Sequence, residues 1–314
     1  MTTDSTLSIS HLTVKFGGLV ALDDVYLDVR ANSIVGLIGP NGAGKTTLFN
    51  SISGLVPVTT GEISIHGKNV AWPKSYDLAG YGIARTLQGV GLFSGLSVVE
   101  NVMMGANIES GSNFFKDLFG LSGQAEKKLR RRAEDALAWA GALALADKKP
   151  SDLTYPETKR VSIARALVLQ PSILLLDEPA AGLGQDDIDK FAALLQQIKQ
   201  RCSIIIVEHH VDFIGEISDQ VYVLNFGKVI ASGSFDNRPP WLEKPFRDSI
   251  HNYVKCRAVL HGLTRIHELG LSKYLTTRQF GCFPKTDQRG ISDGGSKILG
   301  DIHGVFLRKP VTKV

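Results

Sequence analysis

Hydrophobic and polar residues alternate along the first part of the chain. The alternation over residues 7–16 is typical of a half-buried strand, and a pair of glycines follows as a turn. It resumes over residues 25–29, and a continuous apolar run at residues 34–38 predicts a buried strand. Residues 60–67 are interpreted as a turn, a short strand and a second turn. The beginning of the chain is therefore predicted to be rich in strands.

Helical spacing appears in two places. Apolar residues recur at helical intervals over residues 48–55, with Gly54 near the helix end. From about Val98 the pattern turns helical again, and residues 127–146 predict a strongly amphipathic helix. Its apolar face holds Leu129, Ala133, Ala136, Leu137 and Ala140, and its opposite face holds Lys128 and Arg130 to Arg132. The basic face is most simply solvated, and we do not interpret it as a nucleic-acid site.

Two more apolar runs predict central strands of a parallel sheet. Residues 173–176 lead into an Asp-Glu pair, and residues 203–207 lead into Glu208 and His209. A hairpin is predicted around residues 225–228, between two short strands. Strands that alternate with helices in this way indicate an α/β fold.

Charge separates the chain into two unlike parts. The net charge is +4, but residues 239–314 hold 13 Lys/Arg against 6 Asp/Glu, and the rest holds 22 against 25. The basic residues of the tail are scattered, which favours a weakly ordered, solvated segment. The three cysteines fit no metal or disulfide framework, no run approaches the roughly 18 apolar residues of a membrane span, and no secretion signal is evident. A reducing cytoplasm is the simplest compartment.

The strongest chemical motif follows the strand at residues 34–38. It fits G-x-x-x-x-G-K-[ST], and it lies between a predicted strand and a predicted helix, as a phosphate-binding loop requires. Backbone N–H groups would converge on one anion, the helix N-terminus would add partial positive charge, and Lys45 would neutralise phosphates. Its residues are Gly39, Pro40, Asn41, Gly42, Ala43, Gly44, Lys45, Thr46 and Thr47. A chance glycine-rich turn is the alternative, and the flanking elements argue against it.

Two acidic residues end the strand at residues 173–176. Ligands of open α/β sheets bind at the carboxyl ends of the strands, so Asp177 is suited to Mg²⁺ and Glu178 to orienting a water molecule. A capped turn is the structural alternative, but it gives the acid pair no purpose. His209 ends the next strand and becomes a candidate contact for a γ-phosphate. A single histidine at a strand end is more often structural.

In this order the motifs resemble the ATP-binding subunits of ABC transporters, and most of all the ATPases of branched-chain amino acid importers. The resemblance covers residues 7 to about 238 and is carried by residues 16–18, 39–47, 84–88, 176–183, 207–209 and 222–227. It implies a P-loop NTPase of ABC type, with a mixed sheet core, an antiparallel β subdomain and a helical subdomain at about residues 96–169. We expect the nucleotide-binding domain to span residues 1–238 and a divergent basic tail to span residues 239–314.

The resemblance also implies roles for single residues. Phe16 would stack on adenine, and Gln88 would sense Mg²⁺ and the attacking water while linking the chain to the membrane subunits. Asp177 would hold Mg²⁺ together with Thr46, Glu178 would act as general base, and His209 would contact the γ-phosphate. Two such chains face each other head to tail, so that each ATP lies between one phosphate loop and the partner's signature segment.

The signature segment departs from the pattern of the family, which reads close to Leu-Ser-Gly-Gly-Gln or Leu-Ala-Tyr-Gly-Gln. Here it is Leu153, Thr154, Tyr155, Pro156 and Glu157. Thr154 and Glu157 still form a capping box for a helix through residues 160–169. Pro156 offers no N–H to a phosphate, and Glu157 would repel one. Gly184 also replaces an expected Asn or Asp. We therefore predict an asymmetric ATPase with one weak ATP site.

The leading hypothesis is the ATPase of an importer for branched-chain amino acids, at the cytoplasmic face of the inner or plasma membrane. Expected partners are transmembrane permease subunits, a second ATP-binding subunit in a heterodimer, and indirectly an extracytoplasmic solute-binding protein, with no nucleic acid. ATP and Mg²⁺ are the expected cofactors. Three alternatives stay open: import of another small polar solute such as urea or amides, a soluble non-transport ABC ATPase, and a catalytically weak regulatory subunit. For the tail, a shifted reading frame near Arg238 is a second hypothesis.

Overall fold

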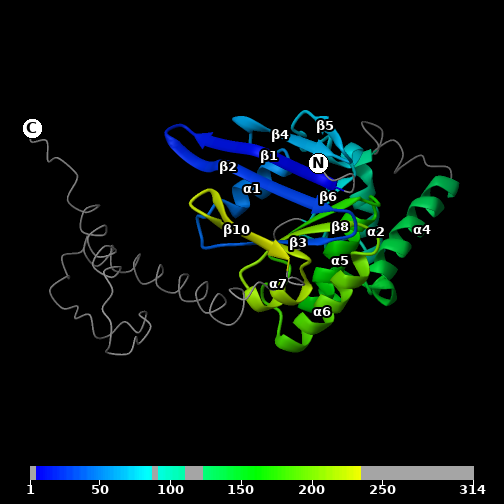
Figure 1. The fold of residues 1–314 in the computed structure, drawn as a ribbon. Coiled ribbons are helices and arrows are strands. Elements are labelled where there is room, and N and C mark those ends of the chain that lie inside the picture. Colours follow the sequence, from blue (N-terminus) through cyan, green and yellow to red (C-terminus); the bar gives the residue numbers. More distant parts are fainter. Residues whose placement is uncertain (1–4, 87–90, 110–122, 235–314) are drawn as a thin grey trace, which may run out of the picture. The chain divides into compact units, whose positions relative to one another are not determined.

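The computed structural model describes residues 5–86, 91–109 and 123–234. Among these, two sheets are formed (Figure 1). The first is antiparallel, with the strand order β2-β1-β4-β5. Its strands are β1 (Ser5–Phe16), β2 (Leu19–Arg30), β4 (Thr60–Ile65) and β5 (Lys68–Val70). The predicted turn between the first two strands is confirmed at Gly17 and Gly18.

The second sheet has the strand order β10-β9-β3-β8-β7-β6. All its neighbouring strands run parallel except β10, which forms a hairpin with β9. Every residue of β3, β7 and β8 is buried, as expected for parallel strands that are covered on both faces. The strands are β3 (Ile34–Ile38), β6 (Ile83–Arg85), β7 (Ile173–Asp177), β8 (Ser203–Val207), β9 (Gln220–Asn225) and β10 (Lys228–Ser234).

The α-helices of the described residues fall into two groups, those that connect strands of the second sheet and those that pack against one another. Helix α1 follows β3 directly, and α6 and α7 connect the later strands of the second sheet. The helices α2, α4 and α5 pack against one another, since α4 contacts both of the others. Their bounds are α1 (Lys45–Ile52), α2 (Val98–Met103), α4 (Gly123–Trp139), α5 (Tyr155–Leu167), α6 (Gln185–Ile198) and α7 (Val211–Ile217). Among the described residues, no helix is long and apolar enough to cross a bilayer.

Short 3-10 turns fill the connections between these elements. They are η1 (Leu78–Tyr81), η2 (Met104–Glu109), η3 (Leu143–Leu145) and η4 (Pro150–Asp152).

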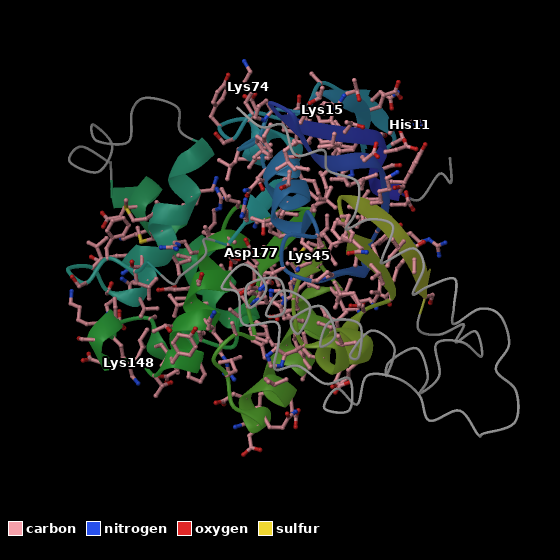
Figure 2. All side chains as sticks on the ribbon, turned by 90° about the vertical axis from the view of Figure 1, so that its left-hand side faces the viewer. His11, Lys15, Lys45, Lys74, Lys148 and Asp177 are labelled. Atoms are coloured by element: carbon pink, nitrogen blue, oxygen red, sulfur yellow. The ribbon has the colours of Figure 1, made fainter. Side chains whose placement is uncertain are left out.

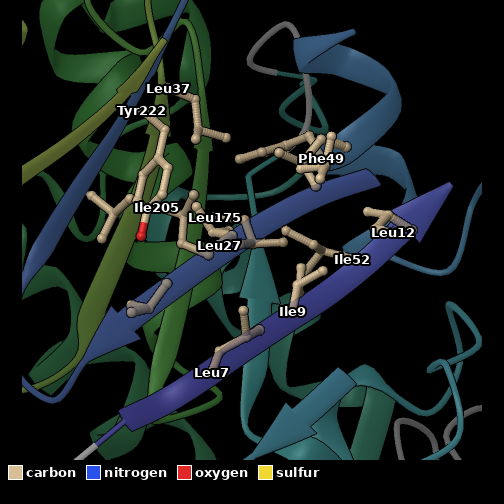
Figure 3. Close-up of a cluster of buried hydrophobic side chains, with 14 of the residues drawn as sticks. Leu7, Ile9, Leu12, Leu27, Leu37, Phe49, Ile52, Leu175, Ile205 and Tyr222 are labelled. Atoms are coloured by element: carbon tan, nitrogen blue, oxygen red, sulfur yellow. The ribbon is translucent and has the colours of Figure 1, made fainter. Parts of the chain in front are cut away.

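One hydrophobic cluster joins both sheets to helix α1 (Figure 3). Phe49 and Ile52 project from α1 between side chains of β1 and β2, such as Leu7 and Leu27, and side chains of the second sheet, such as Leu175. Each of these side chains is at most 2% exposed. Burial of one such side chain is worth about 1.5–3 kcal/mol, so the cluster fixes α1, and with it the loop before α1, against the sheet.

One of two helix ends differs from the sequence-based expectation. The apolar pattern predicts a helix to residue 146, but α4 ends at Trp139, and Gly141 follows with φ +63°. A glycine in this left-handed conformation commonly ends a helix. Leu55 continues the helical spacing of α1 but lies beyond its end, 59% exposed, because Gly54 has φ +65°. The spacing alone therefore overestimated the end of α4, whereas α1 ends close to Gly54, as predicted.

Candidate nucleotide-binding and hydrolysis site

The predicted phosphate-binding loop connects the end of β3 to the start of α1. Two of its glycines, Gly39 and Gly44, have no room for a side chain. A Cβ on Gly39 would lie 2.2 Å from the Leu224 carbonyl oxygen, and one on Gly44, at φ +105°, would lie 2.8 Å from a Leu22 methyl. Both positions therefore require glycine, and the loop is held between β2 and β9.

Lys45 is the first residue of α1, and it is 5% exposed. Its Nζ donates hydrogen bonds to the carbonyl oxygens of Gly39 at 2.7 Å and Pro40 at 3.1 Å, so the ammonium lies inside the curl of the loop. Burial lowers the pKa of Lys45, and the nearby carboxylates of Glu178 and Asp177 oppose this shift. Figure 2 shows Lys45 and Asp177 in the same region. A cation is thus placed where an entering phosphate would need it.

Asp177 ends β7, and its side chain is only 4% exposed. Its Oδ2 accepts a hydrogen bond from the Arg85 guanidinium at 3.0 Å. Arg85 comes from β6, and it also donates to Asn50 Oδ1 at 2.7 Å and to Ser53 Oγ at 3.1 Å. No role for Arg85 was predicted from the sequence. The available signal was a single cation in an otherwise apolar strand, because such a residue needs a partner once it is buried.

Glu178 and His209 contact each other. His209 Nε2 lies 2.9 Å from Glu178 Oε1, and the two side chains are 42% and 34% exposed. The contact follows from the sheet register, because Asp177 pairs with Val207 in the β7–β8 ladder and the two residues stand just beyond that pair. Glu178 has φ +46°, a left-handed conformation that is uncommon for a residue with a side chain. The structure therefore brings together the candidate base and the candidate phosphate contact.

Glu208 is an acid that the sequence analysis left without a role. It is 1% exposed, and its carboxylate accepts the N–H of Ala180 at 2.7 Å and the N–H of His209 at 3.1 Å. Burial raises the pKa of Glu208, while these two hydrogen bonds lower it. The sequence pattern could not show this burial, because Glu208 directly follows a strand, and polar residues at a strand end can be either buried or exposed.

The signature segment, residues 153–157, lies at the start of α5. The predicted capping box is confirmed: Thr154 Oγ1 accepts from the N–H of Glu157, and Glu157 Oε2 accepts the Thr154 N–H at 2.7 Å. These bonds lower the pKa of Glu157, so it carries a charge at neutral pH. Tyr155 extends across to the segment after β7, where its hydroxyl donates to the Ala181 carbonyl at 3.0 Å.

Three predicted site residues remain, which are Phe16, Thr46 and Gln88. Phe16 ends β1 with its ring about half exposed, and Thr46 is exposed in the first turn of α1. Gln88 and the tail at residues 239–314 lie outside the described residues. The predicted roles of these residues stay predictions.

Comparison with known proteins places this geometry in a family. Residues 22–181, about half of the chain, match the ABC transporter family. This chain belongs to the ABC transporter family. Its relatives are ATP-hydrolysing cassettes, and the chain is accordingly an ATP-binding ATPase subunit of a transporter with the fold that the motifs predicted.

Relatives and solved structures cover most of the cassette. The branched-chain amino acid transport ATP-binding proteins LivG of Salmonella typhimurium and BraF of Pseudomonas aeruginosa are 35% and 34% identical over 232 residues, which is 73% of this chain and 91% of each relative. The lipopolysaccharide export ATP-binding protein LptB of Haemophilus influenzae is 32% identical over 231 residues, 73% of this chain and 91% of that protein. The ADP conformation of an ATP-binding cassette has a TM-score of 0.68 at 27% identity, covering 79% of this chain and 98% of that one.

Proposed function

We propose that this cassette hydrolyses ATP with Glu178 as the general base. The observation that carries this proposal is the 2.9 Å contact between Glu178 and His209, at the strand ends that face the phosphate-binding loop. Glu178 accepts a proton from water, the water oxygen attacks the γ-phosphorus, and the bond to the β,γ-bridging oxygen breaks to release ADP and phosphate. His209 holds the base in place and contacts the γ-phosphate.

The groups that hold the nucleotide are proposed from the loop geometry. Lys45 exchanges its bonds to the loop carbonyls for bonds to phosphate oxygens, and the N–H groups at the start of α1 bind the same anion. The half-exposed ring of Phe16 offers a surface for adenine.

The donor set also fits Mg²⁺. This ion prefers oxygen ligands and usually takes one or two from the protein, with phosphate oxygens and waters completing the octahedron. The Thr46 hydroxyl and the Asp177 carboxylate would supply them, and the bound ion would neutralise phosphate charge. Within the described part of the chain, no group of three or more His, Cys, Asp or Glu could hold a metal ion.

Phosphate release by the isolated transporter complex tests these roles. Glu178→Gln keeps the size of the side chain but removes its basicity, so turnover is expected to fall at least about 100-fold while ATP binding is retained. Glu62→Gln, the same change on an exposed residue of β4, is the control and should leave turnover unchanged. Full turnover by Glu178→Gln would refute the assignment of the base.

We infer further that the cassette energises the import of branched-chain amino acids. The support is the identity with the LivG and BraF proteins over nearly the whole cassette. Lipopolysaccharide export by another relative shows that the cassette fold itself does not choose the solute. In this proposal the chain binds peripherally at the cytoplasmic face of the membrane to transmembrane permease subunits, which work with an extracytoplasmic solute-binding protein.

A pull-down of the chain from its native membranes in mild detergent tests this proposal. Two multi-span subunits together with a second ATPase would support the importer, and uptake of radiolabelled leucine by the reconstituted complex would support the solute. Uptake of urea or an amide in place of leucine would correct the solute alone. Recovery of ribosomal or DNA-repair proteins would overturn the transport proposal.

We also propose that the ATP site completed by this chain's signature segment is weak. Glu157 occupies the N-terminus of α5 with its own carboxylate, which accepts the Thr154 N–H and hydroxyl. Its lowered pKa keeps it ionised, so a γ-phosphate would meet a like charge at a position where the family pattern places no acid. Pro156, in the first turn, has no N–H to offer. A heterodimer with an intact signature on the partner would keep one competent site.

Restoring the signature tests this asymmetry. The double variant Pro156→Gly with Glu157→Gln should raise turnover per complex. The single variant Glu157→Asp, which keeps the charge, should not. Unchanged turnover in the double variant would contradict the weak-site proposal.

A further inference from the structure

We propose that Glu208 is a positioning residue that holds Glu178 and His209 in contact. The inference rests on the proposed roles of those two residues in hydrolysis. Glu208 itself is 1% exposed, so its side chain is almost fully buried. It acts on the reaction through the backbone of the two segments that carry the reacting side chains.

The geometry joins two short segments that leave neighbouring strands. One is the turn after β7, in which the Ala181 N–H bonds to the Glu178 carbonyl at 3.2 Å and the Glu178 N–H bonds to Val207 at 2.9 Å. The other is the segment after β8, which carries His209. Glu208 lies between them, with one carboxylate oxygen on the Ala180 N–H and the other on the His209 N–H. Beyond the paired ends of β7 and β8, one carboxylate therefore links the two segments.

A carboxylate suits this position better than any uncharged side chain of the same size. It accepts at both oxygens, whereas a glutamine amide accepts at one and would turn N–H groups toward a backbone N–H. Water has little access to repair the lost bond, because the side chain is almost fully buried. The left-handed turn at Glu178 also depends on surrounding contacts to persist. Loss of one bond to Glu208 should let the turn relax and carry the Glu178 carboxylate away from His209.

Glu208→Gln in the assembled transporter complex tests this role. Turnover per nucleotide-binding site should fall about 10- to 100-fold, the loss expected when a reacting group moves by about 1 Å. The KM for ATP and the stoichiometry of trinitrophenyl-ATP binding should stay unchanged, since the phosphate-binding loop is untouched. Counting sites with the bound analogue separates lost catalysis from lost folded protein.

A spectroscopic readout follows the position of His209 directly. The imidazole NMR signal of His209, identified by its loss in His209→Ala, should change its chemical shift in Glu208→Gln. Asp219→Asn is the control. Asp219 also accepts a backbone N–H, from Ile34 at 2.7 Å, but it is paired with Lys199 and lies at the opposite ends of the strands. This variant should cost stability and leave both the His209 signal and turnover per site in place.

The outcomes distinguish this inference from the proposal beneath it. Wild-type turnover per site and an unmoved His209 signal in Glu208→Gln, with Glu178→Gln inactive, would overturn the positioning role alone. Full turnover in Glu178→Gln would overturn both. If Glu208→Gln does not fold, Glu208→Asp keeps the charge but shortens the reach, and the same loss of turnover is expected from it.

Discussion

Removal of Arg85 is predicted to destabilise the cassette through Asp177. The guanidinium makes the 3.0 Å bond to the Asp177 carboxylate and two further bonds on α1 and just beyond it, to Asn50 and Ser53. The exposed fractions of the two charged side chains are 15% and 4%, so water cannot replace the arginine in the variant Arg85→Ala. The carboxylate would then be left buried without its main partner.

The expected size of the effect follows from this burial. Breaking a buried ion pair by removing one partner costs about 3–5 kcal/mol of the free energy of unfolding. Lys45 lies near the same carboxylate and compensates in part, so about 3 kcal/mol is expected for Arg85→Ala. In an Asp177→Asn background no buried charge is left behind, and removal of Arg85 should cost only about 1 kcal/mol.

Urea unfolding of the wild type, Arg85→Ala, Asp177→Asn and the double variant forms a double-mutant cycle. The coupling energy between Arg85 and Asp177 should come to about 2 kcal/mol. The pair Arg130 and Asp147 is the control. Its nitrogen and oxygen are also close, at 2.8 Å, but the side chains are 44% and 84% exposed. Its coupling should stay below about 1 kcal/mol. Equal couplings in the two cycles would refute the argument that burial, and not distance, gives the Arg85 pair its weight.

Three further variants test local features. Tyr155→Phe removes only the bond to the Ala181 carbonyl and should lower the free energy of unfolding by about 0.5–1 kcal/mol, whereas an equal loss in an unrelated exposed Tyr→Phe change would discount the bond. Gly184→Asn should stabilise the protein by a few tenths of a kcal/mol in the same assay, since Gly184 caps α6 without a side-chain bond and a Cβ there meets no atom within 4 Å. The folded pKa of Glu157 lies below its ordinary value of 4.5, so its capping contribution is complete above that pH and is lost as the pH falls through the folded pKa. Lowering the pH from 7 to 3 should therefore lower the unfolding temperature of the wild type more than that of Glu157→Gln. Parallel plots of unfolding temperature against pH for the two proteins would contradict this.

Local sequence was sufficient wherever the interacting residues are close in the chain. The phosphate-binding loop needs glycines at fixed positions, a lysine and a helix start within nine residues, so its motif could be read directly. The capping box of α5 spans four residues and was predicted for the same reason. The buried strands were also predictable, because a strand that is covered on both faces must be apolar throughout.

The contacts between distant residues could not be predicted from the residues themselves. Arg85 meets Asp177 across 92 positions because β6 and β7 run side by side in parallel. Resemblance to the family suggested roles for Glu178 and His209, but only the β7–β8 register shows that their side chains touch.

The sequence by itself determined the ATPase family, the phosphate-binding loop, the acid-tipped strand and the departure of the signature segment from the pattern. These depend on residue type at fixed spacing, which is a property of the chain. The tertiary structure alone decided which charged residues are buried. Glu208 and Arg85 are of residue types that are mostly exposed to water. Each is largely buried here, and each forms hydrogen bonds inside the protein, because neighbouring strands and the segments after them cover it. Burial depends on what other segments cover a residue, and that information is spread over the whole fold.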